Sequence, residues 1–177
     1  MTQTRVVDQD EPELGAQHAV LPSGSADETR ALGAALGVVA RPGDRIALVG
    51  PLGAGKTQFA KGFAVGLGVA EVVNSPSFTL MAEYEGRLPL FHQDLYRLAG
   101  TSEALEGGLL DERQDDGVTL TEWADRLDAA LDGERVTVRI ESVGETDRRI
   151  EVSGAGDAGR RYVAAAETHR AGEVEAR

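Results

Sequence analysis

The 177-residue sequence contains no cysteine, and basic and aromatic residues are scarce. The lack of cysteine excludes disulfides, thiolate nucleophiles, zinc ribbons and thiolate-held iron clusters. Lysine and arginine number 18 against 30 acidic residues, and this net charge of −12 argues against direct, sequence-independent nucleic-acid binding. No run approaches the roughly 18 apolar residues that span a membrane, and the acidic N-terminus lacks an apolar signal region. The composition predicts a cytoplasmic protein with no membrane association.

The apolar residues divide the chain into one domain with a tail at each end. Residues 1–18 are polar, acidic and aperiodic, which predicts a flexible arm. Residues 165–177 are mostly alanine, glutamate and arginine without a strong pattern, which predicts a disordered tail. Residues 19–164 alternate strand and helix patterns, which indicates an α/β layer fold. Strands are expected at 19–21, 46–49, 78–84, 88–93, 118–121, 136–141, 149–153 and 162–163. Helices are expected at 26–40, 56–67 and 124–131, with a further short acidic helix within 101–112.

A phosphate-binding loop is the most specific motif in the sequence. Residues 50–57 read Gly-Pro-Leu-Gly-Ala-Gly-Lys-Thr, which matches G-x-x-x-x-G-K-[ST] between an apolar strand and a helix. In such a loop the backbone N–H groups point at phosphate oxygens, the lysine reaches the β- and γ-phosphates, and the threonine ligates Mg²⁺. We expect Lys56 to be exposed without nucleotide. The predicted phosphate ligands are Gly53, Ala54, Gly55, Lys56 and Thr57, the last also ligating the metal.

A second glycine motif, G-x-G-x-x-G, occupies residues 154–159. Only 18 residues follow Gly159, too few for the helix, second strand and acidic ribose ligand of a dinucleotide site. We therefore interpret residues 154–159 as a flexible hairpin loop.

Two carboxylates at strand ends could complete a hydrolytic site beside the loop. Asp94 follows the strand at 88–93, and Glu122 follows the strand at 118–121 as a Walker-B acid does. Such a site needs a metal ligand and a group that orients the attacking water, although either acid could instead cap a helix. His92 alternates with Asp94 along its strand and is interpreted as a packing residue rather than a metal ligand. The hydroxyls of residues 74–79 either face a γ-phosphate or simply form a turn.

These residues leave three classes of function open. The N-K-x-D sequence that reads guanine is absent, so a regulatory GTPase is disfavoured. A small-molecule phosphotransferase would need an acceptor pocket and a lid, and little chain remains for them. An ATPase subunit and a nucleotide-gated binding module with incidental hydrolysis are the other two.

The order and spacing of four motifs resemble the bacterial TsaE (YjeE) family. These motifs are the phosphate loop at 50–57, Ser-Pro-Ser-Phe-Thr-Leu at 75–80, His-x-Asp-Leu-Tyr-Arg-Leu at 92–98, and Glu-Trp at 122–123. The resemblance covers about residues 19–143. It implies a P-loop NTPase-type three-layer fold with a mixed, largely parallel sheet and a C-terminal β extension.

The resemblance also implies function. The family's members are ATPases that bind ATP and Mg²⁺, hydrolyse ATP weakly alone, and act with the TsaB and TsaD proteins to attach threonylcarbamoyl to N6 of adenosine 37 in tRNA. Contact with tRNA is expected only through that complex.

The family's functional residues transfer onto this sequence one motif at a time. The switch-like loop falls on Ser75 to Thr79, with Ser77 in a catalytic role beside Asp94 and Glu122. Glu122 also ligates the metal, and Trp123 contacts the nucleotide. The start of the N-terminal helix lies near the base, which indicates Ser25 and Asp27. The sequence departs from the family pattern at Pro51, Gln58 and Ser77.

Overall fold

A computed structural model describes residues 15–98, 101–109, 112–127 and 134–176. Its centre is a seven-stranded sheet in the order β1-β7-β6-β2-β5-β4-β3. The four central strands, β6, β2, β5 and β4, run parallel, and antiparallel strands extend the sheet at both ends. The expected mixed α/β sheet is therefore confirmed. The strands are β1 (Gln17–Ser23), β2 (Arg45–Val49), β3 (Met81–Glu85), β4 (Pro89–Asp94), β5 (Val118–Glu122), β6 (Val136–Ser142) and β7 (Arg148–Gly154).

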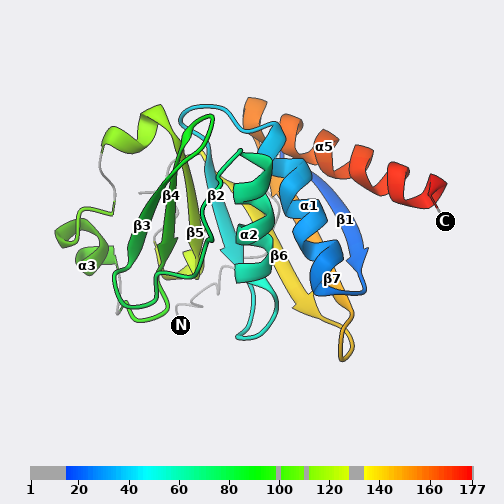
Figure 1. The fold of residues 1–177 in the computed structure, drawn as a ribbon, viewed down its shortest axis with the longest axis horizontal. Helices are drawn as coiled ribbons and strands as arrows, with labels where there is room; N and C mark the ends of the chain where they lie inside the picture. Colours follow the sequence, from blue (N-terminus) through cyan, green and yellow to red (C-terminus); the bar gives the residue numbers. More distant parts are fainter. Residues whose placement is uncertain (1–14, 99–100, 110–111, 128–133, 177) are drawn as a thin grey trace, which may run out of the picture.

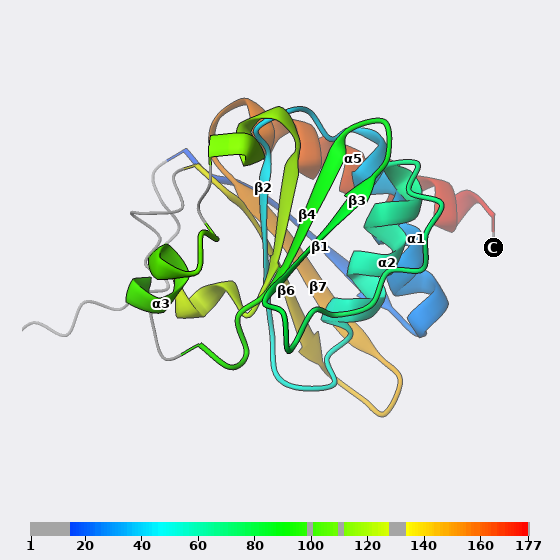
Figure 2. The ribbon, with the colours of Figure 1, turned by 60° about the vertical axis from the view of Figure 1, so that its left-hand side comes forward.

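Helices lie on both sides of this sheet (Figure 2). Helices α1 and α2 cover one face, α3 lies beyond the other, and α5 packs against β1, β7 and α1. The main core lies between the sheet and α1, α2 and α5. No helix of the described ranges is both long and apolar enough to cross a bilayer. The helices are α1 (Ala26–Val38), α2 (Lys56–Gly66), α3 (Thr101–Glu106) and α5 (Gly156–Glu175), with 3-10 turns η1 (Glu112–Asp116) and η2 (Ala124–Arg126).

The packing of α1 against α2 depends on glycine. A Cβ atom added to Gly62 would lie 1.9 Å from the carbonyl oxygen of Arg30, so only glycine allows the two backbones to approach this closely. At the start of α1, the Ser25 side chain accepts a hydrogen bond from the Glu28 backbone N–H at 3.1 Å and so caps the helix. The close packing of α1 against α2 places the N-terminus of α1 beside the loop 50–55, which precedes α2.

Three predicted elements differ in extent. β1 begins at Gln17, inside the predicted flexible arm. β3 begins at Met81 rather than residue 78, because residues 77–79 form a turn closed by a 2.8 Å hydrogen bond from Leu80 N to Pro76 O. Of the helix predicted at 124–131, residues 124–126 form a 3-10 turn and residues 128–133 lie outside the described ranges.

The C-terminal predictions are wrong. Residues 162–163 and 165–175, expected as a strand and a disordered tail, belong to the 20-residue helix α5, whose end reaches past β1 (Figure 1). Residues 154–159, expected as a flexible hairpin loop, are instead the last residue of β7, the N-cap Ala155 and the first four residues of α5. The helix has a weak sequence pattern but buries Tyr162, Val163 and Ala166 on the core, and this packing stabilises it.

A buried carboxylate anchors α5 to the body of the protein. Asp44, directly before β2, accepts hydrogen bonds from both terminal nitrogens of Arg161, at 2.8 and 2.9 Å, and from the Tyr162 hydroxyl at 2.8 Å. The side chains of Asp44 and Arg161 are only 8% and 13% exposed. Burial first, and then the Asp44 charge, raise the pKa of Tyr162, so its hydroxyl keeps its proton and donates.

We expect Asp44→Asn to lower the free energy of unfolding by about 3 kcal/mol, because it removes the only one of the two described acidic partners of Arg161 that is buried with it. Urea unfolding measures the change. Asp157→Asn is the matched control, since Asp157 also contacts Arg161 but its side chain is 65% exposed. Equal stability of the Asp44 variant and the control would contradict an anchoring role.

The anchor also sets a pH dependence. Burial alone would raise the pKa of Asp44, but hydrogen bonds from Arg161, the Arg41 backbone and Tyr162 outweigh it and hold this pKa below 3.8. The carboxylate therefore stabilises the fold fully above pH 3.8, and this stabilisation is lost as the pH falls through the lowered pKa. The stabilities of wild type and Asp44→Asn should converge in acid.

Candidate functional site

The candidate site lies at the carboxyl ends of the parallel strands β2, β5 and β4. The loop 50–55 follows β2, Glu122 is the last residue of β5, and Asp94 is the last residue of β4. Asp94 and Glu122 are direct partners in the register of the two strands. Ligands of open α/β sheets bind at this edge, beyond the carboxyl ends of the strands.

The loop 50–55 has the backbone of an anion-binding turn. Gly53 and Gly55 have φ angles of 77° and 111°, in the left-handed region that favours glycine. Gly55 is the N-cap of α2, and no side chain caps the first turn of that helix. The first backbone N–H groups of α2 and its positive dipole end are therefore available to a phosphate.

Lys56 is buried rather than exposed, so that expectation is wrong. Its side chain folds back along the loop, and Nζ donates to the carbonyl oxygens of Gly50 and Pro51 at 2.6 and 2.8 Å. The ring of Trp123 covers the ammonium, with its centroid 3.9 Å from Nζ. The residue is only 5% exposed.

Two opposing effects act on the positive charge of Lys56, namely burial and nearby carboxylates. Burial lowers the pKa of its ammonium, and the nearby carboxylates of Glu122, Asp125 and Asp94 oppose that shift. An ammonium of this kind gains more from a phosphate than from its present carbonyl partners, because the phosphate carries full negative charge.

Glu122 joins the strand edge to the start of α2. Its carboxylate accepts hydrogen bonds from Thr57 Oγ1, at 3.1 and 3.3 Å to the two oxygens, and its Oε1 lies 2.9 Å from His92 Nε2. Glu122 is 2% exposed. The 3-10 turn that follows has no side-chain cap, so Glu122 is not the helix cap considered as an alternative.

Asp94 caps a turn and also contacts the loop that precedes β3. Its Oδ1 accepts a 2.9 Å hydrogen bond from the Tyr96 backbone N–H, which is the turn-capping role. Its Oδ2 accepts hydrogen bonds from the hydroxyls of Ser75 and of Ser77, the latter at 3.3 Å. The switch-like loop and the β4 end are therefore joined through one carboxylate.

Trp123 has an unusual backbone for its position. Its φ of 58° and ψ of 39° lie in the left-handed region, which is uncommon for a bulky residue and typical of functional segments. The conformation turns the indole over Lys56 and against the ring of Tyr96, with centroids 5.0 Å apart. The indole therefore lies beside the predicted phosphate site.

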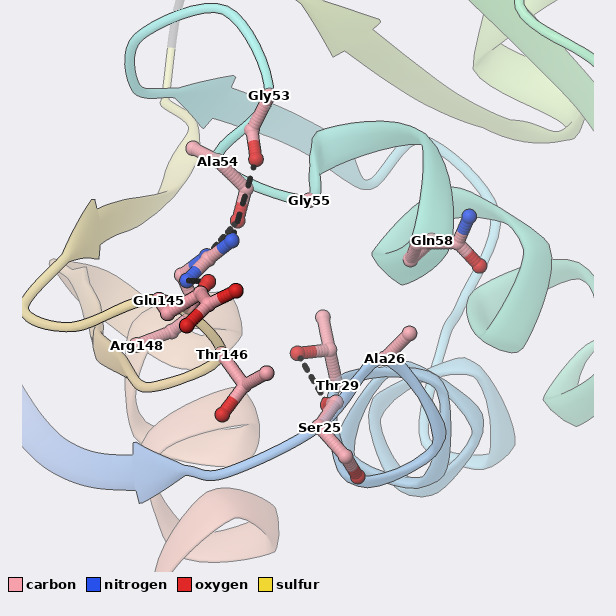
Figure 3. Close-up of a pocket in the computed structure, with 10 residues that line it drawn as sticks. All are labelled: Ser25, Ala26, Thr29, Gly53, Ala54, Gly55, Gln58, Glu145, Thr146 and Arg148. Carbon is pink, nitrogen blue, oxygen red and sulfur yellow. Dashed lines mark hydrogen bonds between the residues drawn. The ribbon is translucent and has the colours of Figure 1, made fainter.

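A pocket of about 350 Å³ adjoins the loop 50–55 (Figure 3). Ser25, one of the two predicted base contacts, lines it. Asp27 does not line it, and its 86% exposed side chain pairs with Arg30 instead. The other lining residues are Ala26, Thr29, Gly53, Ala54, Gly55, Gln58, Glu145, Thr146 and Arg148.

A protein-family model described as "Threonylcarbamoyl adenosine biosynthesis protein TsaE" matches residues 23–150. The chain belongs to the TsaE family. The TsaE protein of Bacillus subtilis is 44% identical over 132 residues, which are 74% of this chain and 82% of that protein. The TsaE protein of Treponema pallidum is 39% identical over 131 residues, 74% and 97% of the two chains. Both are named as tRNA threonylcarbamoyladenosine biosynthesis proteins.

A solved structure supports the same fold. The crystal structure of Bacillus subtilis YdiB superposes with a TM-score of 0.68 at 35% identity, covering 89% of this chain and 97% of that one. The TsaE family match includes the loop 50–55, both strand-end acids, β6 and the first three residues of β7. It ends before α5, so the anchored C-terminal helix lies outside the matched region.

Two residues of this TsaE family member that contact the site were not identified as site residues from the sequence. Arg148, in the β6–β7 region, donates from Nε to the carbonyl oxygen of Ala54 at 2.9 Å and from a terminal nitrogen to that of Gly53 at 3.4 Å (Figure 3). No local pattern marks it, because it lies 94 residues from Ala54 in sequence. His92 contacts Glu122, and its alternation with Asp94 was the signal that could have found it.

The oxygen ligands available at the site suit magnesium, which binds partly through phosphate and water, better than a metal that requires a full set of protein ligands. No cluster of three or more histidine or acidic side chains that could hold a metal occurs in the described ranges. Magnesium typically takes one or two protein oxygens together with phosphate oxygens and water. Thr57 and Glu122, whose oxygens lie within 3.3 Å of each other beside the loop, could supply them.

Proposed function

We propose that this TsaE family member is a Mg²⁺-dependent, ATP-binding and ATP-hydrolysing subunit of the machinery that attaches threonylcarbamoyl to adenosine 37 of tRNA. The observation that carries the proposal is the contact between Glu122 and Thr57 at the start of α2. It joins a strand-end acid to the loop 50–55, as the geometry of a phosphoryl-transfer site requires. The names of its relatives support the pathway.

Each residue of the site has a part in hydrolysis. The N–H groups of residues 53–57 and the Lys56 ammonium bind the phosphates, while Thr57 and Glu122 hold Mg²⁺ directly or through water. A bound Mg²⁺ supplies positive charge that stabilises the transferring phosphoryl group. Asp94 orients the water that attacks the γ-phosphorus, and ADP leaves as the bond to the β-phosphate breaks.

Release of phosphate from ATP without any added acceptor tests this activity. A phosphotransferase would require its acceptor, so acceptor-free, Mg²⁺-dependent release supports hydrolysis. No release by the protein, either alone or with its partners, would contradict the proposal.

The partners in this proposal are the TsaB and TsaD proteins, with tRNA reached only through them. The net charge of −12 opposes binding of the free chain to tRNA, because phosphate neutralisation supplies most non-specific affinity. The same assignment places the protein in the cytoplasm. ATP acts on the complex through the loop 75–79, whose Ser75 and Ser77 hydroxyls contact Asp94 at the edge of the site.

We expect ATP to favour assembly with TsaB and TsaD, and ADP to favour it less, because a ligand drives assembly only through its different affinity for the two states. Size-exclusion chromatography with a non-hydrolysable ATP analogue, with ADP and with no nucleotide measures this. Equal complex formation in all three conditions would contradict the switch, and tight tRNA binding by the free chain would contradict the charge argument.

A further inference from the structure

His92 is a fully buried histidine directly behind the candidate site. It lies two residues before Asp94 on β4, and strand alternation places both side chains on the same face of the sheet as Glu122. The residue is 0% exposed. Its backbone is held between β3 and β5, paired in register with Ala82 and Leu120. The ring is therefore a rigid group in the sheet rather than a mobile side chain.

The contact with Glu122 fixes which ring nitrogen carries hydrogen. His92 Nε2 lies 2.9 Å from Oε1 of Glu122, and a carboxylate oxygen only accepts hydrogen bonds. Nε2 is therefore the donor. Nδ1 is buried without a hydrogen-bond partner among the described residues. An N–H at Nδ1 would be an unsatisfied donor, so the geometry favours hydrogen on Nε2.

This donor restricts the Glu122 carboxylate. The terminal torsion of a glutamate is broad, so an unrestrained carboxylate would sample many orientations. Here Oε1 is held by His92, while both oxygens face the Thr57 hydroxyl at 3.1 and 3.3 Å. The two contacts approach from the sheet and from α2, and together they define the plane of the carboxylate.

We infer that His92 is a positioning residue, which donates from Nε2 to Glu122 and so aims that carboxylate at the Mg²⁺ and phosphate side of the site. The inference rests on the proposed function for what Glu122 does. Groups that orient a metal-binding carboxylate typically change metal affinity or activity about 10- to 100-fold when they are removed. His92 does not touch the nucleotide in this assignment.

Two substitutions of His92 separate its donor from its volume. His92→Leu removes the donor and keeps an apolar side chain of similar size, whereas His92→Gln places an amide N–H near the position of Nε2. His169→Leu is the matched control, because His169 also pairs with a glutamate, Glu173 at 3.4 Å, but on α5 away from the site. Circular dichroism and thermal unfolding establish that each variant is folded.

We expect His92→Leu to lower kcat for ATP hydrolysis and the Mg²⁺-dependent part of nucleotide affinity by about 10-fold or more, with affinity in EDTA unchanged. His92→Gln should recover most of this loss, and His169→Leu should match the wild type. Wild-type values for His92→Leu, or equal losses in the leucine and glutamine variants, would overturn the inference.

A measurement independent of hydrolysis tests the same contact. The ¹⁵N chemical shifts of the imidazole nitrogens, assigned by comparison with the His92 variants, report the tautomer of this ring among the chain's three histidines. We expect hydrogen on Nε2 and a changed shift in Glu122→Gln. Hydrogen on Nδ1 alone would overturn the inference even where the wild type hydrolyses ATP. An inactive wild type with hydrogen on Nε2 would refute only the proposed function.

Discussion

Glu122→Gln is expected to retain ATP and to lower its hydrolysis about 100-fold. The substitution removes a negative charge from the place where Mg²⁺ and water would bind, and it keeps the shape of the side chain. The amide oxygen can still accept from His92, and the amide N–H₂ can face the Thr57 hydroxyl, which also accepts. Fluorescent ATP-analogue titration and phosphate release measure the two effects.

The matched control for this variant is Glu141→Gln, the same substitution at a half-exposed glutamate of β6 that pairs with Arg149 on the neighbouring strand β7. It should hydrolyse ATP like the wild type. Asp94→Asn should share the loss of hydrolysis, because Asp94 is the second carboxylate at the strand ends. Normal phosphate release by both Glu122→Gln and Asp94→Asn would contradict a hydrolytic role for these two acids and leave them structural roles alone.

The Glu122→Gln variant also separates hydrolysis from nucleotide-dependent binding. If it binds ATP, does not hydrolyse it and still supports tRNA modification with its partners, the protein acts as a nucleotide-gated module. Loss of modification together with hydrolysis would instead show that turnover is needed. The comparison requires that the variant assemble with TsaB and TsaD as the wild type does.

Lys56→Ala is expected to weaken ATP binding about 10- to 100-fold, the effect of losing a charge-assisted contact of about 1.5–3 kcal/mol. Its only competitor for the role is Lys61, the other lysine of the chain, on the same helix. Lys61→Ala is therefore the matched control and should bind like the wild type. Titration with a fluorescent ATP analogue measures both affinities.

The burial of Lys56 requires a second variant. Alanine would leave a cavity under Trp123, in addition to leaving the Gly50 and Pro51 carbonyls without their donor. Lys56→Met fills that space without a charge, and burial, which lowers the pKa of the Lys56 ammonium, penalises the charged side chain. We expect Lys56→Met to unfold near the wild-type temperature and still to bind ATP weakly. Wild-type affinity in folded Lys56→Met would remove the loop 50–55 from the proposed site.

The sequence determined the parts of this protein that depend on local chemistry. The residues at 50–57 require a strand before them and a helix after them, and both are present as β2 and α2. The strands that precede Asp94 and Glu122 are predicted by their local patterns, and their parallel pairing brings their carboxyl ends to one edge. The family assignment followed from the spacing of these motifs, because four linked patterns rarely occur together by chance.

The tertiary structure decided what depends on contacts between distant residues. Helix α5 has a weak pattern of its own, and its packing and the Asp44 contacts, 117 and 118 residues apart in sequence, stabilise it. Lys56 is buried because Trp123, from another strand end, turns over it. His92 could be read as a packing residue until β4 and β5 placed it beside Glu122. Sequence periodicity reports which face a side chain occupies, and only the fold determines which group it meets there.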